Sequence, residues 1–397
     1  MLRERAQDVA VSGDPVSAVS TRAAQRGRRR SVAFVAAAAV TLSGFGIGIT
    51  VLEHAQGGQR PELPAGGVSA SPSVQTTSGV TPASGSPSDQ PSSSPPNASS
   101  DGWASPVGLA VGKDGSLIIA DAGRNQILVR KSTGQVAVLA GNGVAGYSGD
   151  GGPAAKAELN NPAGIAVGAD GTVYFADSAN NRVRAISPTG TIRTVAGNGA
   201  TGTASDGQPA TTASLLSPIA VAISPTGTVY FTSGSDVDYI SADGTLHVVD
   251  AAAGSIHDPA TGGPIAPAAI AFEKDGSLLV ADEARKNLLR VMPAGSVSVV
   301  APIYVSEAGL ASLPDGTVVV SDYGNYAVST VTGAALRQMA NFLSLGVLAS
   351  SQHVRPGGVA VGGDGTIYVA DTDAAVIVSG TTSGGWHAVP GPAGATP

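Results

Sequence analysis

Short apolar runs separated by glycine-containing turns recur six times in the last three-quarters of the chain. Each copy has an apolar run, a two-residue turn that ends in glycine, a second apolar run and usually an aspartate, as in AGIAVGADGTVYFAD. An Asp-Gly pair between apolar runs is a strong β-hairpin signal, and here it predicts tight type I′ turns. The turn glycines, spaced 40 to 56 residues apart, are Gly115, Gly171, Gly227, Gly276, Gly316 and Gly365.

A third run of mixed polarity follows each aspartate, and in most copies a fourth run comes after it, as in GQVAVLAG and GTIRTVAG. Each repeat therefore predicts about four short antiparallel strands. Four-stranded units that recur every 40 residues or so are typical of β-propeller blades. The predicted fold class is all-β, a six-bladed β-propeller, because a closed ring protects the sheet edges that a linear array would expose.

Two glycine-rich stretches, residues 141–162 and 197–218, are versions of one 22-residue segment. Their starts lie 56 residues apart, and a fixed period marks a repeated structural unit. We expect each stretch to join the fourth strand of one blade to the first strand of the next, with Asn-Gly and Asp-Gly pairs making tight turns. Such connections cover one face of the disc.

An uncharged apolar stretch, Val32–Leu52, precedes the repeats. As a helix rising about 1.5 Å per residue, it spans the roughly 30 Å hydrocarbon core of a bilayer. Arginines cluster just before it, so the positive-inside rule keeps the N-terminus in the cytoplasm and exports the rest. A cleaved signal peptide is the alternative, but its apolar region is typically shorter and ends in an A-x-A-like site, which VLEHAQ lacks.

The residues between this stretch and the repeats fit the same topology. They are rich in Ser, Pro and Gly and contain few apolar side chains, which predicts a disordered tether. The predicted localisation is the cytoplasmic membrane, crossed once, with the propeller on the extracytoplasmic side. The predicted organisation is a basic cytoplasmic tail (1–31), a transmembrane signal anchor (32–52), a disordered linker (53–101) and the propeller (102–397).

Composition narrows the possible functions. The chain has a net charge of −7, and its arginines concentrate before the apolar stretch, so the repeats are acidic. An acidic surface argues against nucleic-acid binding, which needs basic groups that displace counterions. The chain has no cysteine, which excludes disulfides, thiol nucleophiles and cysteine-bound metals.

The most regular polar position is the aspartate that closes the second run of each repeat, replaced by Ser233 in the third copy. An aspartate at a strand end readily accepts backbone N–H bonds from the next turn. Because it occurs once per repeat, a structural role is the favoured interpretation, and a ring of metal ligands is the alternative. The five residues are Asp121, Asp177, Asp282, Asp322 and Asp371.

No catalytic motif emerges from the sequence. The histidines His247, His257, His353 and His387 lie far apart, without HxH or HExxH spacing, and no G-x-S-x-G elbow is present. We therefore predict no catalytic residue and no cofactor. Calcium or zinc in the central channel of the propeller stays open as an alternative.

Exposed aromatic side chains on a propeller face favour ligand binding. Tyr147 stands among small residues in the first glycine-rich stretch, and Tyr323 and Tyr326 lie in DYGNYAV. Asp150 lies in the first glycine-rich stretch and Asp206 in the second. Weak calcium binding is one interpretation of these aspartates, but the stretches lack the closely spaced carboxylates of a calcium loop. These five are the predicted ligand-binding residues.

The repeats resemble the NHL repeat family of six-bladed propellers. The shared pattern is apolar-G-(I/L)-A-V, D-G, apolar-Y-(F/V)-A-D, N-(R/Q)-(V/I) and T-V-A-G-N-G, clearest over residues 105–199. With the anchor and linker, the chain is similar to the extracytoplasmic sensor part of bacterial receptor Ser/Thr kinases. Only 31 residues precede the predicted span, too few for a kinase domain. The resemblance implies the fold more firmly than any one activity.

The favoured function is a membrane-anchored extracytoplasmic binding or sensor protein that recognises a protein, peptide or cell-envelope ligand. The alternative is a metal-dependent propeller enzyme, a gluconolactonase-like hydrolase or a lyase, with the metal in the channel. A passive envelope scaffold, or a partner subunit of a separate signalling protein, is a third class.

Overall fold

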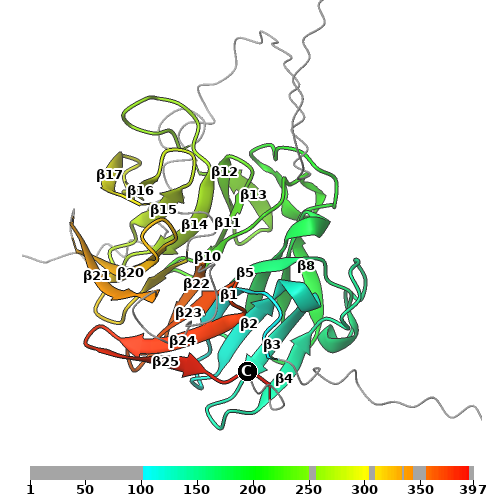
Figure 1. Ribbon diagram of the computed structural model, residues 1–397. Coiled ribbons are helices and arrows are strands. Elements are labelled where there is room, and N and C mark those ends of the chain that lie inside the picture. The colour runs from blue at the N-terminus through cyan, green and yellow to red at the C-terminus, as the bar shows by residue number, and fades with distance from the viewer. Residues whose placement is uncertain (1–101, 250–255, 304–308, 333–334, 343–354, 393–397) are drawn as a thin grey trace, which may run out of the picture. The chain divides into compact units, whose positions relative to one another are not determined.

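The computed structural model describes residues 102–249, 256–303, 309–332, 335–342 and 355–392. These residues form six antiparallel sheets arranged as the blades of a ring (Figure 1). The predicted all-β, six-bladed propeller is confirmed. No helix in these ranges has the length and apolar character to cross a bilayer. The predicted tail, the anchor Val32–Leu52 and the linker lie outside the described residues.

Blades 1 to 3 each contain four consecutive strands, as predicted, and blade 3 gains a short fifth strand from the preceding loop. Blade 1 comprises β1 (Pro106–Val111), β2 (Leu117–Asp121), β3 (Gln126–Arg130) and β4 (Val136–Ala140). Blade 2 comprises β5 (Pro162–Val167), β6 (Val173–Asp177), β7 (Arg182–Ile186) and β8 (Ile192–Ala196). Blade 3 comprises β10 (Val221–Ile223), β11 (Val229–Ser233), β12 (Asp236–Ile240), β13 (Thr245–Val248) and, paired to its outer edge, β9 (Gln208–Pro209).

Blades 4 to 6 repeat this order, and short 3₁₀ turns stand among the connections of blades 1 to 3. Blade 4 comprises β14 (Pro267–Phe272), β15 (Leu278–Asp282), β16 (Asn287–Val291) and β17 (Val297–Pro302). Blade 5 comprises β18 (Leu310–Ser312), β19 (Val318–Asp322), β20 (Ala327–Thr332) and β21 (Ala335–Asn341). Blade 6 comprises β22 (Pro356–Val361), β23 (Ile367–Asp371), β24 (Val376–Thr381) and β25 (Gly384–Val389). The 3₁₀ turns are η1 (Ala122–Arg124), η2 (Ala154–Lys156), η3 (Ser178–Asn180) and η4 (Ala210–Thr212).

The hydrophobic core lies between neighbouring blades. Both faces of an inner strand are covered by the sheets on either side, so the second strands read as continuous apolar runs, and β2, β15 and β19 are buried along their whole length. The outermost strands, such as β4 and β8, are less completely buried, because only one of their edges is paired within the sheet.

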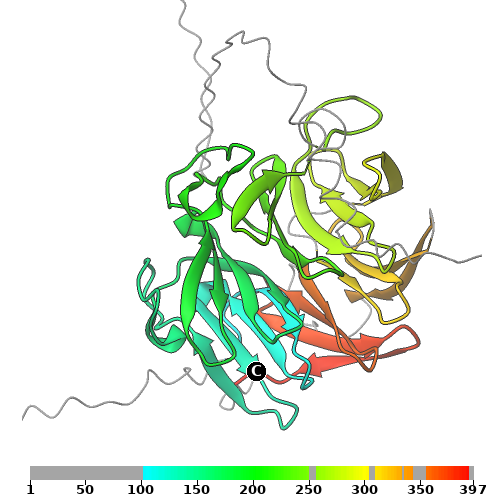
Figure 2. The same cartoon turned by 180° about the vertical axis from the view of Figure 1, so that it is seen from behind.

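The ring closes without exchanging a strand. Every sheet is made of strands from one stretch of sequence, and β22 of the last blade packs against β1 of the first. The two blades lie side by side in both views (Figure 1 and Figure 2). Trp103, which precedes β1, is buried in one apolar cluster with Ile377 and Val389 of blade 6. The Thr372 hydroxyl also donates a hydrogen bond to the Pro106 carbonyl at 3.1 Å.

The hairpins differ from the predicted type I′ turns. All six turn glycines have positive φ, between 75° and 91°, but the residues before them do not. In blade 1, Gly115 N–H donates to Gly112 O at 2.9 Å, which makes a type I turn followed by one left-handed glycine. The Asp114 carboxylate accepts the Ser116 N–H at 3.0 Å and hydroxyl at 2.6 Å, and this favours the longer loop.

Candidate functional site

The inner strands of all six blades line a central cavity of ≈ 160 Å³. Asn161 supplies the one polar side chain among its lining residues, and the rest are glycine, alanine, valine, leucine and isoleucine. A Cβ on Gly108 would overlap Ala163 O, and one on Gly358 would overlap Val107 O, so neighbouring inner strands touch backbone to backbone. The small residues of these strands therefore keep a narrow, apolar channel.

The described residues bring no three His, Cys, Asp or Glu side chains together in a way that could hold a metal ion. His247 Nδ1 lies 3.1 Å from Asp206 Oδ1, and His387 Nε2 lies 3.2 Å from the Ser379 hydroxyl, at separate places in the ring. His353 lies outside the described residues. Calcium or zinc in the channel thus stays a prediction.

One face of the propeller, here called the loop face, carries the connections between blades and the turns between second and third strands. The register fixes this placement, because the start of each first strand lies beside the end of the second, as in Pro106 beside Asp121. Of the six exposed large apolar side chains among the described residues, five belong to segments of this face, and the sixth, Val299, lies in β17. The five are Val144, Tyr147, Leu216, Ile219 and Tyr323.

The two glycine-rich stretches fold alike on the loop face. In each, a 3₁₀ turn (η2 or η4) is followed by the first strand of the next blade, as expected of a connection between blades. Equivalent hydrogen bonds hold the two stretches in the same backbone path. In each stretch, glycine N–H groups donate to a carbonyl of the 3₁₀ turn, to a carbonyl just before the next blade, and to a carbonyl in the fourth strand of that blade. These bonds are Gly141 N to Ala154 O and Gly197 N to Ala210 O, Gly146 N to Leu159 O and Gly202 N to Leu215 O, and Gly151 N to Ile192 O and Gly207 N to Leu246 O.

The strand-end aspartates hold the backbone where one blade leads into the next. Asp121 accepts the N–H groups of Ala104 and Ser105, both at 2.9 Å, from the segment that enters β1. Ser233 accepts the Leu216 N–H at 2.9 Å in blade 3, so the hydroxyl makes the equivalent bond. Asp177, Asp282 and Asp371 likewise accept N–H groups from Asn160, Ala266 and Arg355, and Asp322 accepts that of Asn325 in the following turn.

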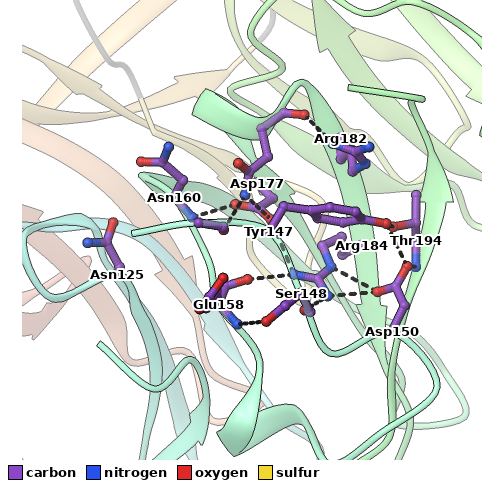
Figure 3. A network of polar contacts seen from close by, with 12 residues as sticks. Asn125, Tyr147, Ser148, Asp150, Glu158, Asn160, Asp177, Arg182, Arg184 and Thr194 are labelled. Atoms are coloured by element: carbon purple, nitrogen blue, oxygen red, sulfur yellow. Dashed lines mark hydrogen bonds and ion pairs between the residues drawn. The ribbon is translucent and has the colours of Figure 1, made fainter. Parts of the chain in front are cut away.

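A buried arginine lies at the centre of the first glycine-rich loop (Figure 3). Arg184 in β7 is fully buried, and its guanidinium donates to the main-chain oxygens of Ser148 at 2.8 Å and Glu158 at 2.9 Å. It also forms ion pairs with Asp150 at 2.7 Å and with Asp177 at 3.3 Å. One side chain of blade 2 thereby contacts two separate parts of the loop, at Ser148 and at Glu158.

Tyr147 and Asp150, two predicted ligand-binding residues, are part of this network (Figure 3). The Tyr147 hydroxyl lies 3.0 Å from Asp150 Oδ2 and 3.1 Å from the Thr194 hydroxyl. The Arg182 guanidinium lies 3.6 Å from the centre of the Tyr147 ring, a cation–π contact. Tyr147 is still 40% exposed, so the network fixes the side chain while part of it stays in contact with solvent.

The two carboxylates around Arg184 respond differently to burial. Burial by itself would raise the pKa of Asp150, but hydrogen bonds from Thr194 and Arg184 outweigh it and hold that pKa below 3.8. Asp177 is deeper, and burial raises its pKa above 3.8 despite its bonds to Asn160, Asn180 and Arg184. Asp150 is therefore the carboxylate that the network stabilises in its charged form.

Blade 3 carries acids where blade 2 carries arginines. Asp236 and Asp238 in β12 take the places of Arg182 and Arg184 in β7. Asp238 is 1% exposed, and neither of its carboxylate oxygens has a hydrogen-bond partner among the described residues. Burial, followed by the charges of Asp236 and Asp206, raises the pKa of Asp238 well above 3.8.

The other predicted binding residues occupy separate places on the loop face. Asp206 accepts the Val248 N–H at 3.2 Å and contacts His247. Tyr323 and Tyr326 belong to the turn between β19 and β20, with ring centres 6.0 Å apart. Tyr323 is 39% exposed, whereas Tyr326 has a left-handed backbone (φ 50°) and packs against the apolar core of blades 5 and 6.

The charged residues of the third strands in blades 2 and 3 were missed at the level of sequence. Arg182, Arg184 and Asp238 belong to no catalytic or metal motif, and the third strands looked merely mixed in polarity. A signal was present, since RVRAI in blade 2 and DVDYI in blade 3 place opposite charges at alternate positions of equivalent strands. Comparing repeats position by position would have found it.

Comparison with known families and proteins agrees with this architecture. The sequence model of the Teneurin NHL domain matches residues 131–204, which cover the end of blade 1, all of blade 2 and part of the second glycine-rich loop. No curated protein sequence matches the chain significantly.

Solved structures with similar folds include lyases, gluconolactonases and an auxiliary nutrient binding protein, all at low sequence identity. A candidate gluconolactonase is 16% identical over 69% of this chain and 87% of its own, with a TM-score of 0.50. A virginiamycin B lyase from Staphylococcus aureus is 15% identical over 72% of this chain and 84% of its own, with a TM-score of 0.47. A gluconolactonase from Xanthomonas campestris is 15% identical over 73% and 86%, with a TM-score of 0.46. At such identities the first likeness shows the fold alone.

Proposed function

We propose that this chain is an extracytoplasmic binding protein anchored in the cytoplasmic membrane. The six blades and the match to the Teneurin NHL domain support an NHL-repeat β-propeller as its folded part. The loop face is its binding surface, and a protein, peptide or cell-envelope ligand is its partner. The sequence Val32–Leu52 supplies the anchor, and the residues that follow supply the tether.

The observation that carries the proposal is the placement of exposed apolar side chains. Five of six belong to segments of the loop face, among them Val144 at 55% and Leu216 at 45% exposure. Aromatic and aliphatic side chains that stay exposed on one face favour association with a partner, because covering them removes apolar area from water. Tyr147 adds a pre-positioned aromatic ring, of the kind that is enriched at the centres of interfaces.

The same observations give less support to an enzyme. The channel, where propeller enzymes with a metal would work, is lined by apolar residues and Asn161 in the part of the chain that the structure describes. The likeness to a candidate gluconolactonase concerns the fold. We therefore do not extend the proposal to hydrolase or lyase chemistry.

Topology is tested with single cysteines, because the natural chain has none. The variant Val144→Cys should react with a membrane-impermeant maleimide in intact cells, since that position is 55% exposed on the loop face. The variant Ser17→Cys, in the predicted cytoplasmic tail, should react only after the cells are permeabilised. Labelling in the opposite order would refute the proposed orientation.

Binding is tested by charged substitutions on the loop face. Val144→Asp and Leu216→Asp should reduce capture of a partner from solubilised envelope fractions by the full-length chain, because each places a charge in the apolar surface. The matched control is Val299→Asp, which changes an apolar side chain of similar exposure (41%) in β17, away from that face. Equal capture by all three variants would refute the loop face as the binding surface.

A further inference from the structure

Two equivalent positions in blades 2 and 3 carry side chains of opposite charge. Arg184 pairs with Phe175 in the β6–β7 ladder, and Asp238 pairs with Phe231 in the β11–β12 ladder. Equal register places both side chains on the same side of their sheets, toward the glycine-rich loop that covers each blade. The surroundings of Arg184 in blade 2 and of Asp238 in blade 3 can therefore be compared directly.

In blade 2 this position holds a cation surrounded by oxygen atoms. The Arg184 guanidinium meets the main-chain oxygens of Ser148 and Glu158 and the carboxylate of Asp150 (Figure 3). The arginine is fully buried, so these oxygens take the place of water around its charge. The first glycine-rich loop therefore places its oxygen atoms around a positive charge.

Blade 3 repeats the two main-chain oxygens and the loop carboxylate, with Ser233 in place of Asp177, but has no arginine at the position of Arg184. Since the two loops share the same backbone bonds, Ala204 O and Ser214 O correspond to Ser148 O and Glu158 O. Asp206 corresponds to Asp150, because its carboxylate accepts the N–H of Val248 in β13 as Asp150 accepts that of Thr194 in β8. Where blade 2 adds a guanidinium, blade 3 adds the carboxylate of Asp238.

The Asp238 carboxylate is buried without a partner. It is 1% exposed, and neither oxygen accepts a hydrogen bond from any described residue. Buried polar groups in folded proteins are nearly always paired, and an unpaired buried carboxylate is costly. Its acidic neighbours, Asp206 and Asp236, increase that cost. A bound cation removes the cost by supplying the charge that Arg184 supplies in blade 2.

We propose that blade 3 binds Ca²⁺ beneath its glycine-rich loop, through the carboxylates of Asp206 and Asp238 and the main-chain oxygens of Ala204 and Ser214. Calcium accepts oxygen ligands in irregular arrangements that include backbone carbonyls, whereas Mg²⁺ requires near-octahedral geometry and Zn²⁺ favours nitrogen and sulfur. The site uses two carboxylates rather than three side-chain ligands, and it lies apart from the central channel.

The test is a calcium titration of the full-length chain after treatment with a chelator. Calorimetry should give one equivalent of Ca²⁺ with a dissociation constant on the order of 0.1–1 mM, as in extracellular modules. Saturating Ca²⁺ should raise the midpoint of thermal unfolding by about 2–5 °C, because the ligand binds only the folded state. Equal concentrations of Mg²⁺ should have a smaller effect.

Two variants and one control decide the outcome. Asp238→Asn should weaken Ca²⁺ binding at least tenfold, and Asp238→Arg, which restores the residue of blade 2, should fold and show no calcium response. The control Asp243→Asn removes an exposed acid from the same blade and should bind Ca²⁺ like the parent. Absence of calcium binding by the parent, an undiminished response in both Asp238 variants, or an equal response to Mg²⁺ would overturn the proposal.

Discussion

The guanidinium of Arg184 and the carboxylate of Asp150 lie 2.7 Å apart, with the arginine fully buried and the aspartate one-third exposed. This pair connects β7, in the sheet of blade 2, to the first glycine-rich loop on the face that we propose for binding. Ala154, Ala157 and Leu159 of this loop are buried in the apolar cluster of blades 1 and 2, and Arg184 adds polar contacts to the segment around Asp150. Arg184 therefore holds the part of the loop between Ser148 and Glu158, in addition to the apolar packing and the main-chain hydrogen bonds of the loop.

Replacing Arg184 with methionine should destabilise the protein by about 3–5 kcal/mol, because it leaves the buried Asp177 and the Asp150 carboxylate without their positive partner. The midpoint of urea-induced unfolding measures this loss. Arg182→Met is the matched control, since Arg182 is only partly buried and should cost about 1 kcal/mol. Equal losses in the two variants would contradict the central role of Arg184.

Asp150→Asn should reduce stability at neutral pH and lose this effect in acid. The pKa of Asp150 is held below 3.8 in the folded protein, so its charge stabilises the fold above that pH, and this contribution disappears as the pH falls through the folded pKa. Urea unfolding at pH 7, 5 and 3 should show the parent and the variant converging at the lowest pH. In an Arg184→Met background the effect at pH 7 should be smaller, since the two groups interact.

Gly358→Ala should destabilise the ring by about 1–3 kcal/mol, because the added Cβ overlaps the Val107 carbonyl of the neighbouring inner strand. Thermal unfolding gives the comparison. Gly363→Ala is the control: a Cβ there meets no atom within 4 Å, and its φ lies outside the left-handed region. A neutral Gly358→Ala variant would show that the inner strands can move apart.

Trp103→Ala should loosen the junction between the first and last blades. The side chain is 4% exposed and packs with Ile377 and Val389, so its loss should cost about 3–5 kcal/mol. Limited proteolysis should then cut the terminal blades first. Trp386→Ala, at a partly buried tryptophan within blade 6, should have a smaller effect and no such preference.

The repeat pattern was sufficient to predict the fold. Six pairs of apolar runs around turn glycines predict six hairpins. A repeat that holds about four strands predicts one sheet per repeat, and a ring is the arrangement that buries both faces of each sheet. The type of hairpin was predicted wrongly, because Asp-Gly suits both a two-residue and a three-residue loop. The Asp114 bonds to Ser116, which favour the longer one, depend on a residue outside the pair.

The candidate site was less predictable. Tyr147 and Asp150 could be singled out because they are large or charged residues in a glycine-rich stretch, but their partners Arg184 and Thr194 lie 34 and 47 residues away along the chain. Such contacts depend on strand register and on the path of the loop. The unpaired state of Asp238 is a property of packing, and no local pattern in the sequence reports it.

The absence of strand exchange at the closure, within the described blades, has a consequence for how such a chain can be altered. A cut in the connection between two blades, placed before β9 in the case of blades 2 and 3, breaks one peptide connection and no ladder of backbone hydrogen bonds. Circular permutants that join the present ends of the ring and open it elsewhere should therefore keep every sheet intact. Likewise, duplicating one repeat would add one complete blade rather than parts of two blades.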